Sequence, residues 1–210
     1  MPQVRVRSLG ANLGPSSDDA SPVNLKSAMR ISLVSCDLDL LELAVQNPSA
    51  LEQRIEARIA SGWDDFAGAM KVSREKLSAS PALSGWWTHL LLVDEPPIVA
   101  GVCGYTGPPT AEGSVEIAYA VAPSYRGRGL ATAAARELTQ RAFEDPRVRV
   151  VCAHTLPEHN ASTRILQKIG MSFAGFAHDA DEGPVWRWEL PRKDAELASL
   201  RNERSDRSRR

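Results

Sequence analysis

The stretch Val121-Ala-Pro-Ser-Tyr-Arg-Gly-Arg-Gly-Leu-Ala131 joins an alternating strand to an amphipathic helix. Gly127 and Gly129 allow positive φ angles and a close approach of the backbone to a ligand, which a Cβ would obstruct. The helix that follows presents free N–H groups and the positive end of its dipole, beside Arg126 and Arg128. The stretch therefore predicts an anion site that suits two successive phosphates.

Two familiar phosphate-binding patterns do not fit this loop. A P-loop requires Gly-Lys-Ser/Thr, which does not follow here, and the dinucleotide fingerprint requires a third glycine where Thr132 stands. A plainer alternative also stays open at this point, in which the glycines only close the connection between a strand and a helix.

Composition limits the class of protein. With 210 residues and 43% hydrophobic content, we expect one domain with tails. The 25 basic and 26 acidic residues nearly balance, so we expect no nucleic-acid partner. We find no apolar run that could span a membrane and no export signal, which favours a cytoplasmic protein without a membrane partner. Cys36, Cys103 and Cys152 lack metal-ligand spacing, so we expect reduced thiols and no metal site.

The chain divides into three parts by composition. Residues 1–27 are rich in Gly, Ser, Asp and Pro, which favours a flexible leader. Residues 28–191 carry the hydrophobic periodicity of a folded domain. Residues 192–210 are dominated by charged side chains and are expected to form a solvated tail.

Hydrophobic periodicity and turn signals predict a mixed α/β domain whose sheet is mostly antiparallel. Asn160 is typical of an N-cap, and Gly170 of the residue that ends a helix. The expected order is strand 30–34, helices 37–46, 48–60 and 64–78, strands 88–93, 98–105 and 115–121, a helix from Leu130, strand 147–155, a helix from Asn160 to Gly170, and two final strands.

Three separated motifs resemble the GNAT superfamily of N-acetyltransferases, and more narrowly its RimJ/RimL-like branch. They are Val115-Glu-Ile-Ala-Tyr-x-Val121, the loop Arg126-Gly-Arg-Gly-Leu-Ala131, and Asn160-Ala-Ser-Thr-Arg-Ile-Leu-Gln-Lys-Ile-Gly170. The resemblance covers roughly Met29 to Pro191. It implies the GNAT fold, with a sheet that is splayed at an acyl-CoA site and flanked by helices. It also implies that the chain is an acetyl-CoA-dependent N-acetyltransferase.

The resemblance further implies how acetyl-CoA is held. The pyrophosphate would lie on backbone N–H groups at the start of the helix, and the pantetheine arm between the strand that ends at Val121 and the strand 147–155. A backbone N–H near Val121 would then face the thioester oxygen, as an oxyanion hole requires. The expected cofactor-binding residues are Val121, Arg126, Gly127, Arg128, Gly129, Leu130, Ala131, Thr132 and Asn160. Asn160 has an equally good alternative as a helix cap only.

Glu116 is the candidate base. It shares one strand face with Ala118 and Ala120, whose small side chains leave a hollow for an incoming amine. The resemblance implies a catalytic glutamate at this position, usually acting through water. The alternatives are a glutamate on a wetted sheet face or a partner for an arginine.

Ser162 is the candidate proton donor to the departing thiolate, again by resemblance. Many GNAT enzymes use a tyrosine after the last helix, and residues 170–178 contain none. The chain departs from the commonest spacing because Asn160 lies two residues before this serine, so whether Asn160 or His159 lines the cofactor channel stays open.

The acceptor is expected to be a primary amine, either a protein or peptide N-terminus or a small molecule. Free α-amines have a pKa of ~7.7–8.0 and lysines ~10.4, so neutralising them at pH 7 costs roughly 1 and 4.6 kcal/mol. A single glutamate favours the easier α-amine. A small amine and a non-catalytic acyl-CoA-binding module remain alternatives, and a homodimer is left open. The aromatic candidates for the wall of the acceptor cleft are Trp63, Trp86, Trp87 and Tyr119.

Overall fold

The computed structural model describes residues 30–94 and 96–193. The expected leader, residues 1–27, and all of the expected tail except its first two residues lie outside these ranges. Of those two, Arg192 continues the folded domain, since its guanidinium donates to the carbonyl oxygens of Asp145 and Val148 at 2.6 and 2.8 Å. None of the helices in the described ranges has the length and apolar character needed for a membrane span.

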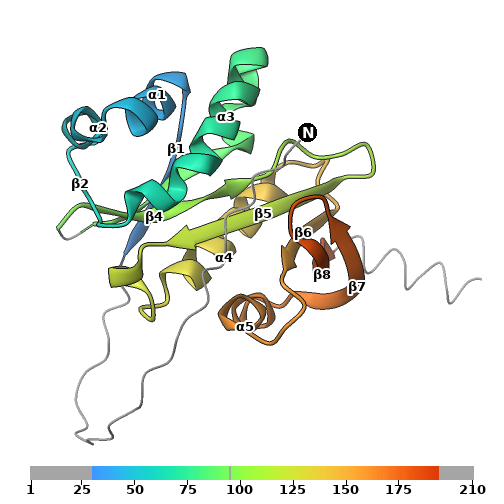
Figure 1. Ribbon diagram of the computed structural model, residues 1–210. Helices are drawn as coiled ribbons and strands as arrows, with labels where there is room; N and C mark the ends of the chain where they lie inside the picture. Colours follow the sequence, from blue (N-terminus) through green and yellow to red (C-terminus); the bar gives the residue numbers. More distant parts are fainter. Residues whose placement is uncertain (1–29, 95, 194–210) are drawn as a thin grey trace, which may run out of the picture.

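A mixed sheet of eight strands forms the middle of the molecule (Figure 1). The strands lie in the order β1-β3-β4-β5-β6-β8-β7, and β2 pairs with β4 outside this path. The β5–β6 and β2–β4 pairs are parallel, and the other pairs are antiparallel. The strands are β1 (Ile31–Ser35), β2 (Arg58–Ile59), β3 (Thr88–Val93), β4 (Ile98–Tyr105), β5 (Ser114–Val121), β6 (Val150–Thr155), β7 (Ser172–Asp179) and β8 (Gly183–Pro191).

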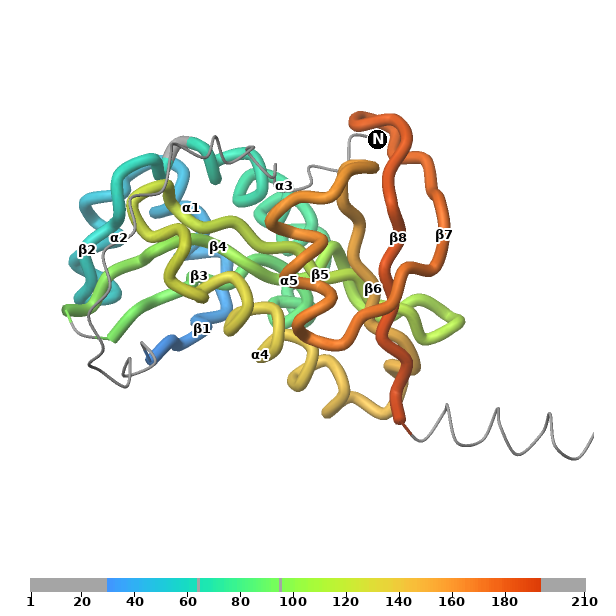
Figure 2. Tube along the Cα trace, turned by 90° about the horizontal axis from the view of Figure 1, so that it is seen from below, coloured from blue at the N-terminus to red at the C-terminus, as the bar shows by residue number. Residues whose placement is uncertain are grey.

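Helices cover both faces of this sheet. On one face lie α1 (Leu38–Gln46), α2 (Pro48–Ile55) and α3 (Ala67–Ala79) (Figure 1). On the other lie α4 (Leu130–Glu144) and α5 (Ala161–Lys168), which run side by side (Figure 2). Within the described ranges, the order is completed by the short 3-10 helices η1 (Trp63–Phe66), η2 (Pro81–Trp86) and η3 (Pro123–Tyr125). The expected fold class is confirmed.

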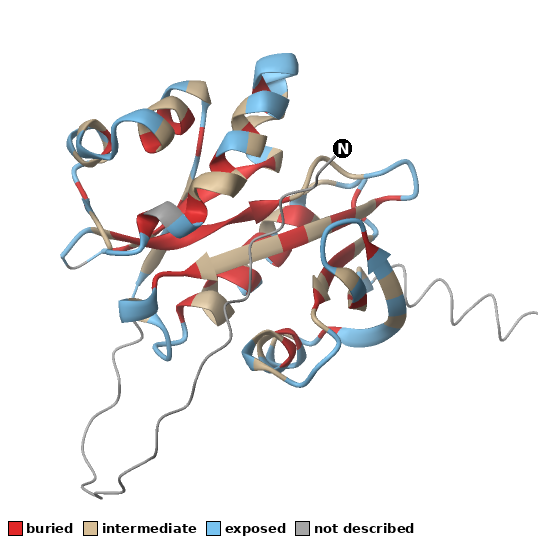
Figure 3. Ribbon diagram, viewed as in Figure 1, coloured by how far each residue is buried: buried red, intermediate tan, exposed pale blue. Residues whose placement is uncertain are grey.

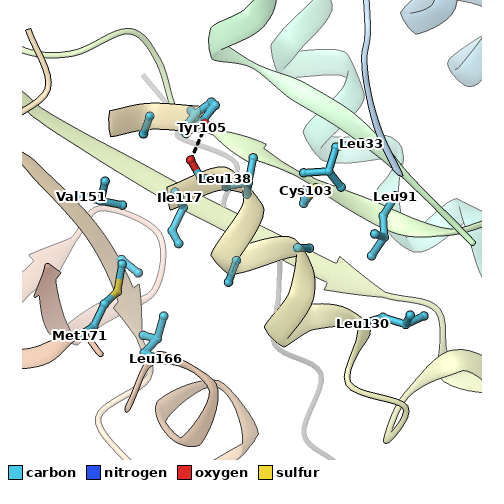
Figure 4. Packing of buried hydrophobic residues seen from close by; sticks show 14 of the residues in the cluster. Leu33, Leu91, Cys103, Tyr105, Ile117, Leu130, Leu138, Val151, Leu166 and Met171 are labelled. Carbon is cyan, nitrogen blue, oxygen red and sulfur yellow. Dashed lines mark hydrogen bonds between the residues drawn. The ribbon is translucent and has the colours of Figure 1, made fainter. Parts of the chain in front are cut away.

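Two hydrophobic clusters hold the layers together, one on each face of the sheet. The cluster beneath α4 contains Ile117, Leu130 and Leu138, and within it the Tyr105 hydroxyl donates to the Leu138 carbonyl at 2.7 Å (Figure 4). The other cluster joins α1 and α3 to β3 and β4. As Figure 3 shows, the central strands are therefore buried, whereas the edge strand β7 is largely exposed.

The prediction of a helix over residues 48–60 is wrong in its second half. The helix α2 ends at Ile55, because Glu56 adopts a left-handed conformation with φ of 54°. The chain then pairs with β4 as β2, where the N–H of Arg58 donates to the Pro97 carbonyl at 3.0 Å. The apolar spacing of Leu51, Ile55 and Ile59 thus continues across a change of secondary structure, because both segments pack on the same cluster.

Smaller differences occur at other boundaries. The predicted helix 64–78 begins as the 3-10 helix η1 before α3, and the predicted strand 147–155 starts only at Val150 as β6. The segment before β6 is held by a turn, in which the Val148 N–H donates to the Asp145 carbonyl at 3.1 Å.

Candidate active site

The strands β5 and β6 are paired for only three residues and then separate. Ser114, Val115 and Glu116 pair with residues 150–152 of β6. Beyond Glu116, β5 continues to pair with β4 as far as Val121, while β6 continues with β8. In the described chain, the β6-facing side of residues 117–121 therefore has no strand partner. Main-chain N–H and C=O groups in such a place require one. The splay expected at this position is present.

The loop after β5 has the geometry that its sequence predicts. Gly127 and Gly129 have φ angles of 74° and 82°, and a Cβ at either position would meet nothing within 4 Å. Gly129 is the N-cap of α4 and contributes no side-chain acceptor, so the first N–H groups of α4 are left for another partner. An open glycine cradle at the start of a 15-residue helix is what a phosphate group requires.

A cleft of about 350 Å³ lies between the start of α4 and one face of α5. Most residues expected to hold the cofactor line it: Val121, Arg126, Gly127, Gly129, Leu130, Ala131 and Thr132, together with Ser162. Arg128, Asn160 and Glu116 are not part of its lining. The cleft therefore gathers the predicted phosphate loop and the predicted proton donor in one place.

Two of the expected cofactor residues have other contacts. The Arg128 guanidinium folds back onto its own loop, donating to the Ser124 carbonyl at 3.0 Å and lying over the Tyr125 ring. Asn160 caps α5, since its side-chain oxygen accepts from the N–H groups of Ser162 and Thr163 at 2.9 and 3.1 Å. These contacts favour the helix-cap alternative for Asn160.

The sequence predicted only part of the basic lining of the cleft. Arg164 and Lys168 of α5 line it together with Arg126, whose Nε donates to the Val121 carbonyl at 3.1 Å. Three positive charges around a pocket of this size suit a ligand with several phosphates. The signal was in the sequence, because Ala161, Arg164, Ile165 and Lys168 recur at helical spacing on one face. What the sequence did not reveal is that this face of α5 points at the cleft.

Tyr119 also lines the cleft and is hydrogen-bonded to the Ser162 side chain. Burial raises the pKa of the Tyr119 hydroxyl, and the hydrogen bond with Ser162 acts in the opposite direction. The raised pKa keeps the phenol protonated at neutral pH. Tyr119 was expected in the wall of the acceptor cleft, and it lines the predicted cofactor cleft instead. Trp63, another of these candidates, donates to the Ala44 carbonyl within the α1–α3 core.

Glu116 lies on the opposite face of β5 from Tyr119, and it has a partner that sequence reasoning missed. Its Oε1 is 2.8 Å from Nδ1 of His154 on β6. Its Oε2 is 3.5 Å from the Thr106 hydroxyl. The pairing register accounts for this contact: Cys152 lies opposite Glu116, and His154 follows on the same face two residues later. The alternation of β6 contains this signal, but the register between two distant strands is not visible in the sequence.

Among the described residues, no group of three or more His, Cys, Asp or Glu side chains converges as metal ligands would.

The acetyltransferase (GNAT) domain family matches residues 35–172. A relative from Bacillus subtilis (strain 168), the uncharacterized N-acetyltransferase YjdG, is 24% identical over 143 residues, which are 67% of this chain and 85% of the relative.

Solved structures share the fold at lower identity. A GNAT acetyltransferase from Bacillus anthracis is similar with a TM-score of 0.53 and 17% identity, over 79% of this chain and 96% of that one. RimL, the ribosomal L7/L12 α-N-protein acetyltransferase in complex with coenzyme A, has a TM-score of 0.55 and 17% identity, over 80% and 97%. The aminoglycoside acetyltransferase AAC(6')-Ib with coenzyme A has a TM-score of 0.54 and 20% identity, over 80% and 98%.

The family match spans most of the domain, and the splayed sheet, the glycine cradle and the basic cleft fit an acyl-CoA. The chain therefore belongs to the GNAT acetyltransferases, the N-acetyltransferases that take their acetyl group from acetyl-CoA.

Proposed function

We propose that this enzyme acetylates the N-terminal α-amine of a protein or peptide, by direct attack of the amine on acetyl-CoA in a ternary complex. The observation that carries the proposal is the gap between β5 and β6. A basic cleft lies on one face of the sheet beside this gap, and a Glu–His pair lies on the other face. Thioester and amine can then meet from opposite faces, and no covalent acyl-enzyme is required.

On the cofactor side, we assign the pyrophosphate to the N–H groups of residues 126–131. The open space at Gly127 and Gly129 and the positive charges of Arg126, Arg164 and Lys168 support this assignment. The pantetheine arm would pair with the unpartnered backbone of β5, and a main-chain N–H near Val121 would serve the oxyanion. The contact of Arg128 within its own loop favours a structural role for this residue. The capping of α5 by Asn160 favours a structural role for Asn160 as well.

Ser162 is proposed to supply the proton that the departing thiolate takes up. Its position in the cleft and its hydrogen bond with Tyr119 support this role. The raised pKa of Tyr119 keeps a phenolic proton next to Ser162, from which the serine can be reprotonated.

On the acceptor side, we propose that Glu116 provides the negative charge that draws the proton from the ammonium group. Glu116 acts through a group that lies between it and the amine, and the resemblance implies that this group is a water molecule. Its pairing with His154 supports a role in proton transfer over a purely wetted position, because both side chains are largely buried.

An α-amine is the preferred acceptor because it is the easier amine to neutralise at pH 7. RimL acts on a protein α-amine by its description and AAC(6')-Ib on an aminoglycoside, and the two are equally similar in fold. The RimJ/RimL-like branch, and with it the protein acceptor, is thus supported by the motifs rather than by the fold. The free thiols of Cys36, Cys103 and Cys152 support a cytoplasmic location.

An acceptor panel tests the proposed substrate class. Release of coenzyme A from acetyl-CoA would be measured with peptides bearing a free N-terminus, with N-terminally blocked lysine peptides, with polyamines and with aminoglycosides. We expect the highest kcat/KM for free N-termini. Turnover confined to polyamines or aminoglycosides would contradict the proposed acceptor, and binding of coenzyme A without any turnover would favour a non-catalytic acyl-CoA-binding module.

The phosphate cradle is tested by Gly129→Val, with Gly183→Val as the matched control. Both glycines have positive φ, 82° and 73°, and open space where a Cβ would be, so both variants carry similar backbone strain. Only Gly129 lines the cleft. Isothermal titration calorimetry is expected to show a loss of at least ~100-fold in coenzyme A affinity for Gly129→Val alone, since a branched side chain would occupy the place of the pyrophosphate. Equal affinities in the two variants would show that the loop is misassigned.

Glu116→Gln tests the acid–base assignment. The substitution keeps the size of the side chain and removes its charge, so we expect acetyl transfer to fall at least ~10-fold while coenzyme A binds as before. The rate would be measured at saturating acetyl-CoA, and the affinity by calorimetry. A variant that works as fast as the parent would exclude Glu116 from proton transfer.

A further inference from the structure

Glu116 and His154 form a buried pair that spans the point where β5 and β6 separate. Glu116 is the last residue of β5 that pairs with β6, and His154 lies two residues beyond the last paired residue of β6. The two side chains are 13% and 7% exposed, and the distance from Oε1 to Nδ1 is 2.8 Å. The pair therefore bridges the base of the gap in which the thioester is proposed to lie, on the face away from the cofactor cleft.

The hydrogen bond determines which ring nitrogen can accept a proton. An ionised carboxylate has no hydrogen to donate, so Nδ1 of His154 must donate to Glu116. The lone pair of the neutral imidazole then lies on Nε2, for which the structure gives no partner in the described part of the chain. The His154 side chain is 7% exposed, and Nε2 is not among the fully buried side-chain nitrogens found without a partner in this part of the chain, which are the indole nitrogens of Trp87 and Trp186.

The charges that surround the pair allow a positive imidazole ring. Arg187 lies opposite His154 on β8, but its Nε donates to Glu189 at 2.7 Å, which offsets its charge. Cys152, which lies opposite Glu116 on β6, has its pKa raised by burial and stays a neutral thiol at pH 7. Glu116 is the anion in direct contact with the ring, so it stabilises an imidazolium ion when one forms.

We propose that Nε2 of His154 is the group that removes the proton from the acceptor amine, and that Glu116 is a positioning residue acting through it. This proposal rests on the proposed N-acetyltransferase function. In it, the imidazole of His154 takes the place of the water molecule between Glu116 and the acceptor amine. An imidazole is better matched to an ammonium group than a carboxylate is, because proton transfer is most efficient between groups of similar proton affinity near the working pH.

The protons balance in the proposed sequence. Nε2 takes one proton from the acceptor's ammonium group, and the freed nitrogen lone pair forms the C–N bond to the thioester carbon. The C–S bond then breaks, and the sulfur leaves with the bonding electron pair. The nitrogen loses its second proton to solvent as the amide forms. The thiolate takes one proton from Ser162, and the Ser162–Tyr119 pair regains it from solvent. The imidazolium returns the first proton to solvent, so one proton is released for each amide formed.

The substitution that tests this role is His154→Asn. The asparagine amide places a donor near the position of Nδ1, so the contact with Glu116 can be kept while Nε2 is removed. We expect kcat to fall at least ~100-fold with coenzyme A affinity within a factor of ~3 of the parent. In His154→Ala, we expect added imidazole to restore part of the lost rate, an effect that a purely structural histidine would not give. Parent-like kcat in His154→Asn would overturn the proposal.

The unaltered protein provides a second, independent test that does not depend on how a variant folds. Nitrogen-15 NMR of the neutral form of the His154 ring is expected to show its hydrogen on Nδ1 and none on Nε2. A hydrogen on Nε2 would overturn the proposal, because that nitrogen could not then act as the base.

The failure of this inference can be told apart from failure of the proposed function. An active parent whose His154→Asn variant is equally active removes only the role of His154. A parent that binds coenzyme A and acetylates no amine in the panel removes the proposed function, and the base assignment with it.

Discussion

The constraint on which this structure depends is the unpartnered backbone of β5 after Glu116. A strand in the middle of a sheet normally pairs with a strand on both sides, and residues 117–121 pair with a strand only on the β4 side. The sheet stays intact despite the lost pairing between β5 and β6, because β5 still pairs with β4 and β6 still pairs with β8. An extended ligand that offers amide groups of its own, as pantetheine does, can take the place of the missing strand. The proposed reaction geometry follows from this gap, beside which the glycine cradle and the cleft lie.

Alternation along β5 distributes the chemistry between the two faces of the sheet. Val115, Ile117 and Val121 bury one face against α4, and Tyr119 extends from the same face into the cofactor cleft. Glu116 belongs to the other face, where His154 reaches it from β6. A single short strand therefore separates the group proposed to serve the leaving thiolate from the groups proposed to serve the amine. The gap beside it is the place where the two reactants can meet.

Local features of the site could be predicted from sequence, and features that depend on register could not. The positive φ angles of the loop and the start of α4 were predictable because glycine and helix signals act within a few residues. Glu116 and His154 are 38 residues apart in the sequence, so their contact depends on the register between β5 and β6. The direction of Arg164 and Lys168 depends on how α5 docks. The end of α2 at Glu56 was missed because tertiary pairing of β2 with β4 overrides the helical spacing.

The central claim, that main-chain amides after β5 hold the diphosphate while the strand gap holds the pantetheine arm, is tested most directly by a crystal structure of this chain with coenzyme A. The account predicts the pyrophosphate against the N–H groups of residues 126–131 and the pantetheine arm between residues 117–121 and β6. A coenzyme bound elsewhere, or a gap closed by side chains with the strands paired throughout, would contradict it.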